Sequence, residues 1–119
     1  MQDLQKELYS QRKLLTECIS YMKKVSRKLG KAEYDYRLAL TKAEIALKVN
    51  GYEGEYGKTE SCAWTMVGEI ARGLPEVAEL RLQRDLLKGD LEATMQKIYQ
   101  CKIEIDLLQR EIEAMRKGE

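Results

Sequence analysis

Two long apolar registers, each with alternating steps of four and three residues, constrain this chain more than any other feature. That spacing keeps one apolar seam on one side of an α-helix and is typical of coiled coils. The first register consists of Leu4, Leu8, Gln11, Leu15, Cys18, Met22, Val25, Leu29, Ala32, Tyr36, Ala39, Ala43 and Ala46. The second consists of Val77, Leu80, Arg84, Leu87, Leu91, Thr94, Ile98, Cys101, Ile105, Leu108, Ile112 and Met115. Only Gln11, Arg84 and Thr94 are polar, so the pattern predicts two long helices that pack through their seams as an antiparallel coiled-coil hairpin.

Turn-forming residues predict where these helices begin and end. The pair Asn50-Gly51 is a strong helix stop, because glycine readily adopts the left-handed conformation that closes a helix. Pro75 suits the first position of a helix, where its missing N–H is not needed. We therefore predict a helix over 2–50, a loop with a short helix over 51–74, and a helix over 75–117. Residues 1–119 would then form a single helical-hairpin domain of the all-α class.

The connection between the long helices contains a turn-rich loop over Gly51–Cys62 and a short amphipathic segment. The segment 61–73 predicts a helix that Thr59 or Ser61 caps and Gly73 closes. Its apolar face comprises Trp64, Val67, Ile70 and Ala71. We expect this face to cover the alanine-rich second half of the first helix. The alternative is an exposed binding surface led by Trp64, since tryptophan is common at interaction hot spots.

The hydrophobic core of such a hairpin is thin. The sequence has no Phe and one Trp, and each long helix buries only one stripe. A chain with so small a core commonly needs a partner to cover its remaining apolar surface. We therefore expect a homodimer, in which two hairpins form a four-helix arrangement.

Cysteine usage favours a reducing compartment. The three cysteines, Cys18, Cys62 and Cys101, are odd in number and widely spaced, and the chain has no histidine, so neither a disulfide framework nor a zinc site is expected. If residue 50 lies opposite residue 75, Cys101 faces about residue 24, roughly 9 Å along the helix from Cys18 and too far for a bridge. Cys18 and Cys101 are thus expected as buried free thiols in a cytoplasmic protein. Neither a signal peptide nor a membrane-spanning or lipidation signal is recognisable.

The sequence carries no recognisable catalytic motif. It lacks histidine for acid–base chemistry, a nucleophile elbow and a phosphate-binding loop, and its seams contain no inward carboxylates for a metal. We expect a protein that is not an enzyme, without cofactor, metal or small-molecule substrate.

Positive charge is concentrated in the first half of the chain. Residues 1–50 contain 11 Lys/Arg against 6 Asp/Glu. Five of these cations lie within nine residues, namely Lys23, Lys24, Arg27, Lys28 and Lys31. Such a stripe, flanked by Tyr21 and Tyr34, could follow the phosphates of single-stranded DNA or bind an acidic partner. The competing interpretations are a solvated helix face and attraction to a mildly acidic second helix.

The segments 31–40, 73–85 and 91–105 resemble small helical proteins encoded by tailed phages and prophages of Gram-positive bacteria. The resemblance covers about residues 29–113. Proteins of this kind belong to the early and replication gene region, which implies a role in the host cytoplasm. The resemblance also implies a polar cluster at the loop end of the hairpin, formed by Tyr36, Arg37, Glu79, Arg81, Arg84 and Asp85. From its seam position alone, we expect Arg84 to pair with Asp35 or Glu44, or to extend its head to solvent.

These observations favour a non-enzymatic interaction protein. We expect it to bind a host or phage protein of the nucleic-acid machinery, for example as an inhibitor of a host defence complex. The alternative is a single-stranded DNA-binding accessory protein of phage replication or recombination that uses the stripe from Lys23 to Lys31.

Overall fold

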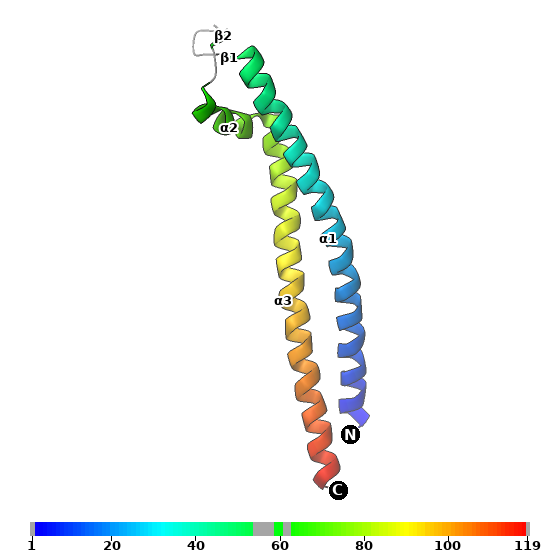
Figure 1. Cartoon of the computed structure of the whole chain (residues 1–119). Coiled ribbons are helices and arrows are strands. Elements are labelled where there is room, and N and C mark those ends of the chain that lie inside the picture. Colours follow the sequence, from blue (N-terminus) through cyan, green and yellow to red (C-terminus); the bar gives the residue numbers. More distant parts are fainter. Residues whose placement is uncertain (1, 54–58, 61–62, 119) are drawn as a thin grey trace. The chain divides into compact units, whose positions relative to one another are not determined.

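The computed structural model describes residues 2–53, 59–60 and 63–118, and these are almost entirely helical (Figure 1). Its elements are α1 (Gln2–Asn50), β1 (Tyr52–Glu53), β2 (Thr59–Glu60), α2 (Trp64–Gly73) and α3 (Pro75–Gly118). The predicted all-α class is confirmed. Helix α1 has the predicted bounds, and α3 ends one residue later than predicted.

The connection contains a small antiparallel ribbon that the prediction of a loop missed. Strands β1 and β2 pair with Tyr52 opposite Glu60 and Glu53 opposite Thr59. Residues 54–58 and 61–62, which include most of the predicted loop as well as Ser61 and Cys62, lie outside the described residues.

The chain divides into two compact units. Unit 1 combines residues up to Arg27 with residues from Gly89 onward, so it holds the first part of α1 and the last part of α3. Unit 2 comprises Lys28–Lys88, with the rest of α1, both strands, α2 and the beginning of α3.

Helix α1 ends where the sequence predicts, and for the predicted reason. Gly51 has a φ of 72°, in the left-handed region, and its N–H donates to the carbonyl of Leu47 at 2.9 Å. A residue with a Cβ would be strained in this conformation, so Gly51 both satisfies an orphan carbonyl and turns the chain away from the helix axis.

The ends of α2 differ from the prediction. Its N-cap is Ala63, without a side-chain hydrogen bond, and the predicted cap Ser61 lies outside the described residues. Gly73 is the last helical residue, and it is Leu74, in an extended conformation, that forms the C-cap. The physical reason is Pro75, because a residue before proline is driven out of the helical region.

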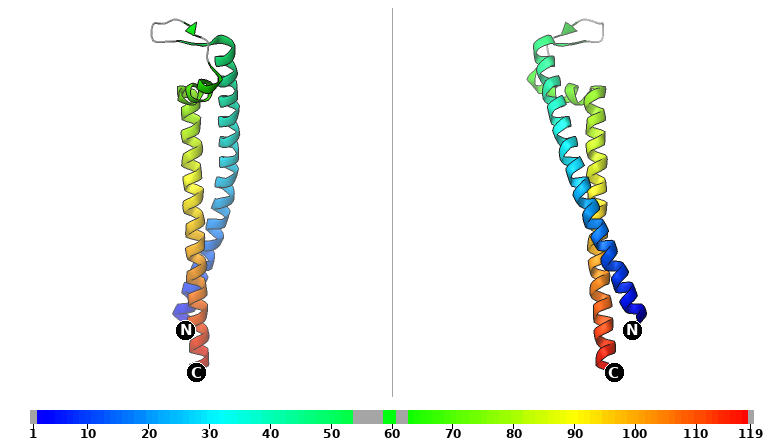
Figure 2. Two further views of the ribbon diagram at one scale, coloured as in Figure 1. Left: turned by 60° about the vertical axis from the view of Figure 1, so that its left-hand side comes forward. Right: turned by 90° about the vertical axis from the view of Figure 1, so that its right-hand side faces the viewer.

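The core of unit 1 is the predicted seam. Its buried side chains are Cys18, Val25, Thr94, Ile98, Cys101, Leu108 and Ile112. The Thr94 hydroxyl donates to the Asp90 carbonyl at 2.8 Å, which satisfies the polar group in this seam. Tyr21 bonds Asp90, while Leu8 shares a groove with Ile112, so the two helix segments of unit 1 run antiparallel (Figure 2).

The core of unit 2 forms where α2 packs on the alanine-rich part of α1. Leu47, Val67 and Ala71 are buried together, and Leu40, Ala43 and Ile70 pack around them. The expected docking of the short helix is thus confirmed, but the expectation that Trp64 joins its buried face is wrong. Trp64 is 75% exposed, because it begins α2 one turn before Val67, beyond the edge of this core.

The two registers are buried or half-buried along their lengths, except at Ala46 and Met115, which are exposed. Next to Ala46, it is Leu47 that turns inward to meet α2. Within the described residues, no helix has an apolar stretch long enough to cross a lipid bilayer.

Two adjacent leucines in α3 give a matched test of this burial. Leu108 is 5% exposed and Leu107 is 47% exposed. We expect Leu108→Ala to lower the free energy of unfolding by about 2–5 kcal/mol, through lost burial and the cavity left behind. Leu107→Ala should change it by less than about 0.5 kcal/mol. Urea denaturation followed by circular dichroism measures both; equal losses would contradict the assigned seam.

Candidate functional site

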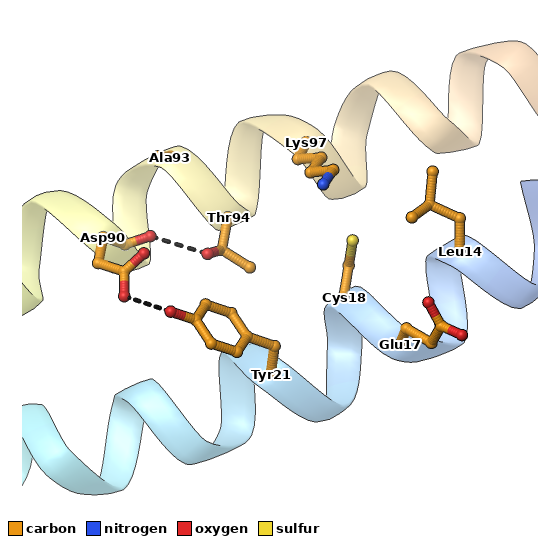
Figure 3. Close-up of a pocket in the computed structure, with 8 residues that line it drawn as sticks. All are labelled: Leu14, Glu17, Cys18, Tyr21, Asp90, Ala93, Thr94 and Lys97. Carbon is orange, nitrogen blue, oxygen red and sulfur yellow. Dashed lines mark hydrogen bonds between the residues drawn. The ribbon is translucent and has the colours of Figure 1, made fainter.

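A groove in unit 1 combines polar and apolar side chains of α1 and α3 (Figure 3). Its volume is about 500 Å³. The lining residues are Leu14, Glu17, Cys18, Tyr21, Asp90, Ala93, Thr94 and Lys97. Leu14, Cys18, Ala93 and Thr94 give it an apolar floor, while Tyr21 and Asp90 close one end.

The Tyr21–Asp90 pair is a polar link between the two helix segments of unit 1. The Tyr21 hydroxyl donates to Asp90 Oδ2 at 2.7 Å (Figure 3). This hydrogen bond, reinforced by the negative charge of Asp90, raises the pKa of Tyr21, because ionising the phenol would break the bond and place two anions together. The phenol is therefore held as a donor, which suits a link between helices rather than proton transfer at neutral pH.

Sequence reasoning assigned Tyr21 to the flank of a nucleic-acid stripe and missed this pair. A signal was available, because Tyr21 and Asp90 each directly precede a seam residue, Met22 and Leu91. In an antiparallel coiled coil such flanking positions meet across the interface.

Cys18 and Cys101 are both free and buried, as expected. Burial raises the pKa of the Cys101 thiol, and the nearby Cys18 adds to the shift. A thiol with a raised pKa is a poor nucleophile at neutral pH, so Cys101 behaves as an apolar seam residue.

The polar residues predicted to cluster lie together in unit 2. Arg84 is half-buried, with its guanidinium 4.6 Å from the ring centre of buried Tyr36. It also contacts Asp85 at 2.9 Å, and Arg81 is 4.0 Å from the other Asp85 oxygen. Arg37 joins through Glu33, at 2.8 Å. Glu79, the remaining predicted member, is exposed and forms none of these ion pairs.

The predicted partners of Arg84 are wrong. Its cross-helix carboxylate is Glu33, at 3.5 Å, and Asp35 pairs with Lys31 instead. Asp85 and Glu33 also raise the pKa of Arg84, so the guanidinium stays charged. The prediction placed residue 75 opposite residue 50, whereas the Glu33–Arg84 contact shifts the start of α3 by about two helical turns along α1. The predicted placement of Cys101 opposite residue 24 is wrong for the same reason. It would put Lys97 opposite residue 28, whereas in unit 1 Lys97 and Cys18 line one groove.

The predicted basic residues are exposed in both units. Lys23, Lys24 and Arg27 belong to unit 1, and none of them forms an ion pair with another described residue. Lys28 and Lys31 belong to unit 2, where Lys31 contacts Asp35 at 3.3 Å. Free cations remain available to an anionic ligand, whereas Lys31 already has a carboxylate.

Trp64 lies on an exposed apolar surface of unit 2. The Lys48 ammonium is 4.3 Å from the centre of its ring, a cation–π contact. Ile45 and Val49, which lie close to Lys48 in the sequence of α1, are exposed as well. We call Trp64 and Lys48 the Trp64 surface. The chain has one tryptophan, and it lies on this surface and not in the core.

The side chains at these sites can make apolar contacts and hydrogen bonds with a partner. The described residues contain no group of three or more His, Cys, Asp or Glu side chains able to hold a metal ion. Comparison with protein-family models, with curated proteins and with solved structures gives no match to this chain.

The Tyr21–Asp90 bond predicts a pH dependence of stability. Its contribution is fully present below the ordinary tyrosine pKa of about 10 and is lost as pH rises through the raised pKa of folded Tyr21. The stability difference between wild type and Tyr21→Phe should therefore shrink above about pH 10. Carbon NMR of labelled tyrosine should show the pKa of Tyr21 falling in Asp90→Asn. An unchanged pKa in that variant would contradict the assigned bond.

Proposed function

We propose that this chain is a non-enzymatic, phage-encoded interaction protein that acts in the host cytoplasm. Its long helices would form an antiparallel hairpin that binds a host or phage protein of the nucleic-acid machinery. One concrete form is an inhibitor of a host defence complex, which needs a stiff surface and no catalytic group. Two copies would associate in a four-helix arrangement.

The exposure of Trp64 carries this proposal. Full burial of a large apolar side chain stabilises a protein by roughly 1.5–3 kcal/mol, so an exposed tryptophan gives up a large gain in folding. Tryptophan is enriched at interface hot spots, where the gain is recovered on binding. Ile45 and Val49, on either side of Lys48 in the sequence of α1, are exposed as well.

The polar cluster around Arg84 supports the same function indirectly. Arg84 holds Glu33 and Asp85, and it stacks on buried Tyr36. These contacts fix α1 against α3 within unit 2, which also holds the Trp64 surface. A rigid scaffold lowers the entropy lost when a surface binds its partner.

A second candidate function is single-stranded DNA binding, favoured by Lys23, Lys24 and Arg27. All three are exposed in unit 1 and free of ion pairs with described residues. Exposed cations at i, i+1 and i+4 can neutralise phosphates without reading bases.

The Trp64 surface is tested by comparing bait proteins expressed in a Gram-positive host. Wild-type bait should retain a defined protein or complex that Trp64→Ala bait loses, because truncating a hot spot weakens binding by about 2 kcal/mol or more. Tyr9→Ala, which removes an aromatic residue of similar exposure in unit 1, is the matched control and should retain that protein. Purification with the captured protein as bait must recover the chain. Retention by both variants, or no specific retention, contradicts the proposal.

The DNA alternative is tested by fluorescence anisotropy with a labelled oligonucleotide. If it is correct, wild type should bind the single strand at low salt and release it as salt rises, since binding releases counterions. Substituting Lys23, Lys24 and Arg27 by Glu should abolish binding, while reversal of Lys102 and Arg116 on α3 should not. Binding that survives the first set of changes would reject this assignment.

A further inference from the structure

The outer face of α3 in unit 1 carries an uncharged strip. It follows the steps of four and three that keep a second helix in contact along its length. The strip consists of Gly89, Ala93, Gln96, Gln100, Ile103 and Leu107. All six residues are exposed, and helical periodicity places them away from the buried Ile98, Cys101 and Leu108, although Ala93 also lines the groove beside Cys18. Such a run stands out in a chain of which 34% is charged.

Large exposed apolar side chains widen the strip. Met95 and Tyr99 are exposed, as are Ile103 and Leu107 within the strip itself. These four residues recur at every fourth position, so they form one continuous ridge on the helix surface. Gly89 and Ala93 precede the ridge, and nothing packs against Gly89, so a neighbouring backbone could approach closely there.

Negative charge borders the strip on both sides. One border holds Glu92, Asp106 and Glu113, and the other holds Asp90, Glu104 and Glu111, with Lys97 as the cation between them. Asp90, Asp106 and Glu113 already have partners within unit 1, namely Tyr21, Arg110 and Lys117. Glu92, Glu104 and Glu111 are exposed and form no ion pair with described residues. The free carboxylates favour an occupant with basic borders.

Two copies of this face fit each other poorly. Two such faces would set the acidic borders of one α3 against those of the other, and like charges close together are unfavourable. The outer positions of α1 in unit 1, namely Ser10, Lys13, Glu17, Ser20, Lys24 and Arg27, are polar or charged and offer no apolar stripe. The complementary shape is instead an amphipathic helix with an apolar stripe between Lys and Arg residues.

We propose that the outer face of α3 in unit 1, from Gly89 to Leu107, binds a basic amphipathic helix of a partner protein. Ile103 and Leu107 receive its apolar stripe, and Glu92 and Glu104 pair with its cations. The inference deepens the proposed interaction function by naming the chemistry of a partner at a second surface. It uses no residue of the Trp64 surface.

The test uses the full chain and two labelled synthetic peptides of four heptads with the same Leu and Ile seam. One peptide has Lys at the positions that flank the seam, and the other has Glu there. Fluorescence anisotropy should show binding of the basic peptide, weakening with salt, and at least tenfold weaker binding of the acidic one. Ile103→Gln with Leu107→Gln should weaken binding of the basic peptide at least tenfold. Glu92→Lys with Glu104→Lys should shift the preference toward the acidic peptide.

Matched variants distinguish this proposal from unspecific electrostatic attraction of the peptide. Leu38→Gln with Ile45→Gln changes two exposed apolar residues of α1 in unit 2 and should leave peptide binding unaltered. Loss with the charge reversal alone, and none with the Gln pair at 103 and 107, would mean unspecific electrostatic attraction and overturn the proposal. Sedimentation that shows self-association abolished by that Gln pair would assign the face to a second copy and also overturn it. Trp64→Ala should bind the peptide normally, so this result is independent of the bait experiment.

Discussion

Burial of two heptad seams is the interaction on which the rest of this structure depends. In unit 1 the seam residues Val25, Ile98 and Leu108 are withdrawn from water, and in unit 2 Tyr36 and Val77 are. A helix that buries a single stripe leaves more than half of its surface to solvent. Residues on the outer faces can therefore change without loss of folding. Where these faces are apolar instead of charged, the difference is informative about binding.

The change of seam residues from large to small explains the position of α2. Alanines at 39 and 43 of α1 leave room beside the helix, and Leu40 and Leu47 supply apolar area for Val67 and Ala71. Ala71 is fully buried, so a larger side chain there would separate the helices. This packing holds α2 at its middle, so Trp64 at its first position extends past the core and reaches Lys48.

The sequence was sufficient to predict the two long helices but not how they align with each other. Periodicity predicted both long helices, and Asn50-Gly51 predicted where α1 ends, because these signals are local. The alignment of α3 with α1 depends on contacts between residues far apart in the sequence, such as Glu33 with Arg84, which no local signal specifies. That single error displaced the expected partner of Arg84 from Glu33 to Asp35 or Glu44, and hid the Tyr21–Asp90 bond. The polar cluster was foreseen as a group, but Glu33, which links Arg37 to Arg84, was overlooked.

Substitution of exposed side chains can test binding in this molecule without disturbing its folding. Leu107 and Leu108 are neighbours in sequence, yet one faces solvent and the other the seam. A change at Leu108 affects folding and binding together, because the outer faces exist only while the seam holds the helices in place. A change at Leu107 or Trp64 leaves the seam intact, so its effects report on partners. This separation makes the outer face of α3 in unit 1 and the Trp64 surface in unit 2 accessible to independent experiments.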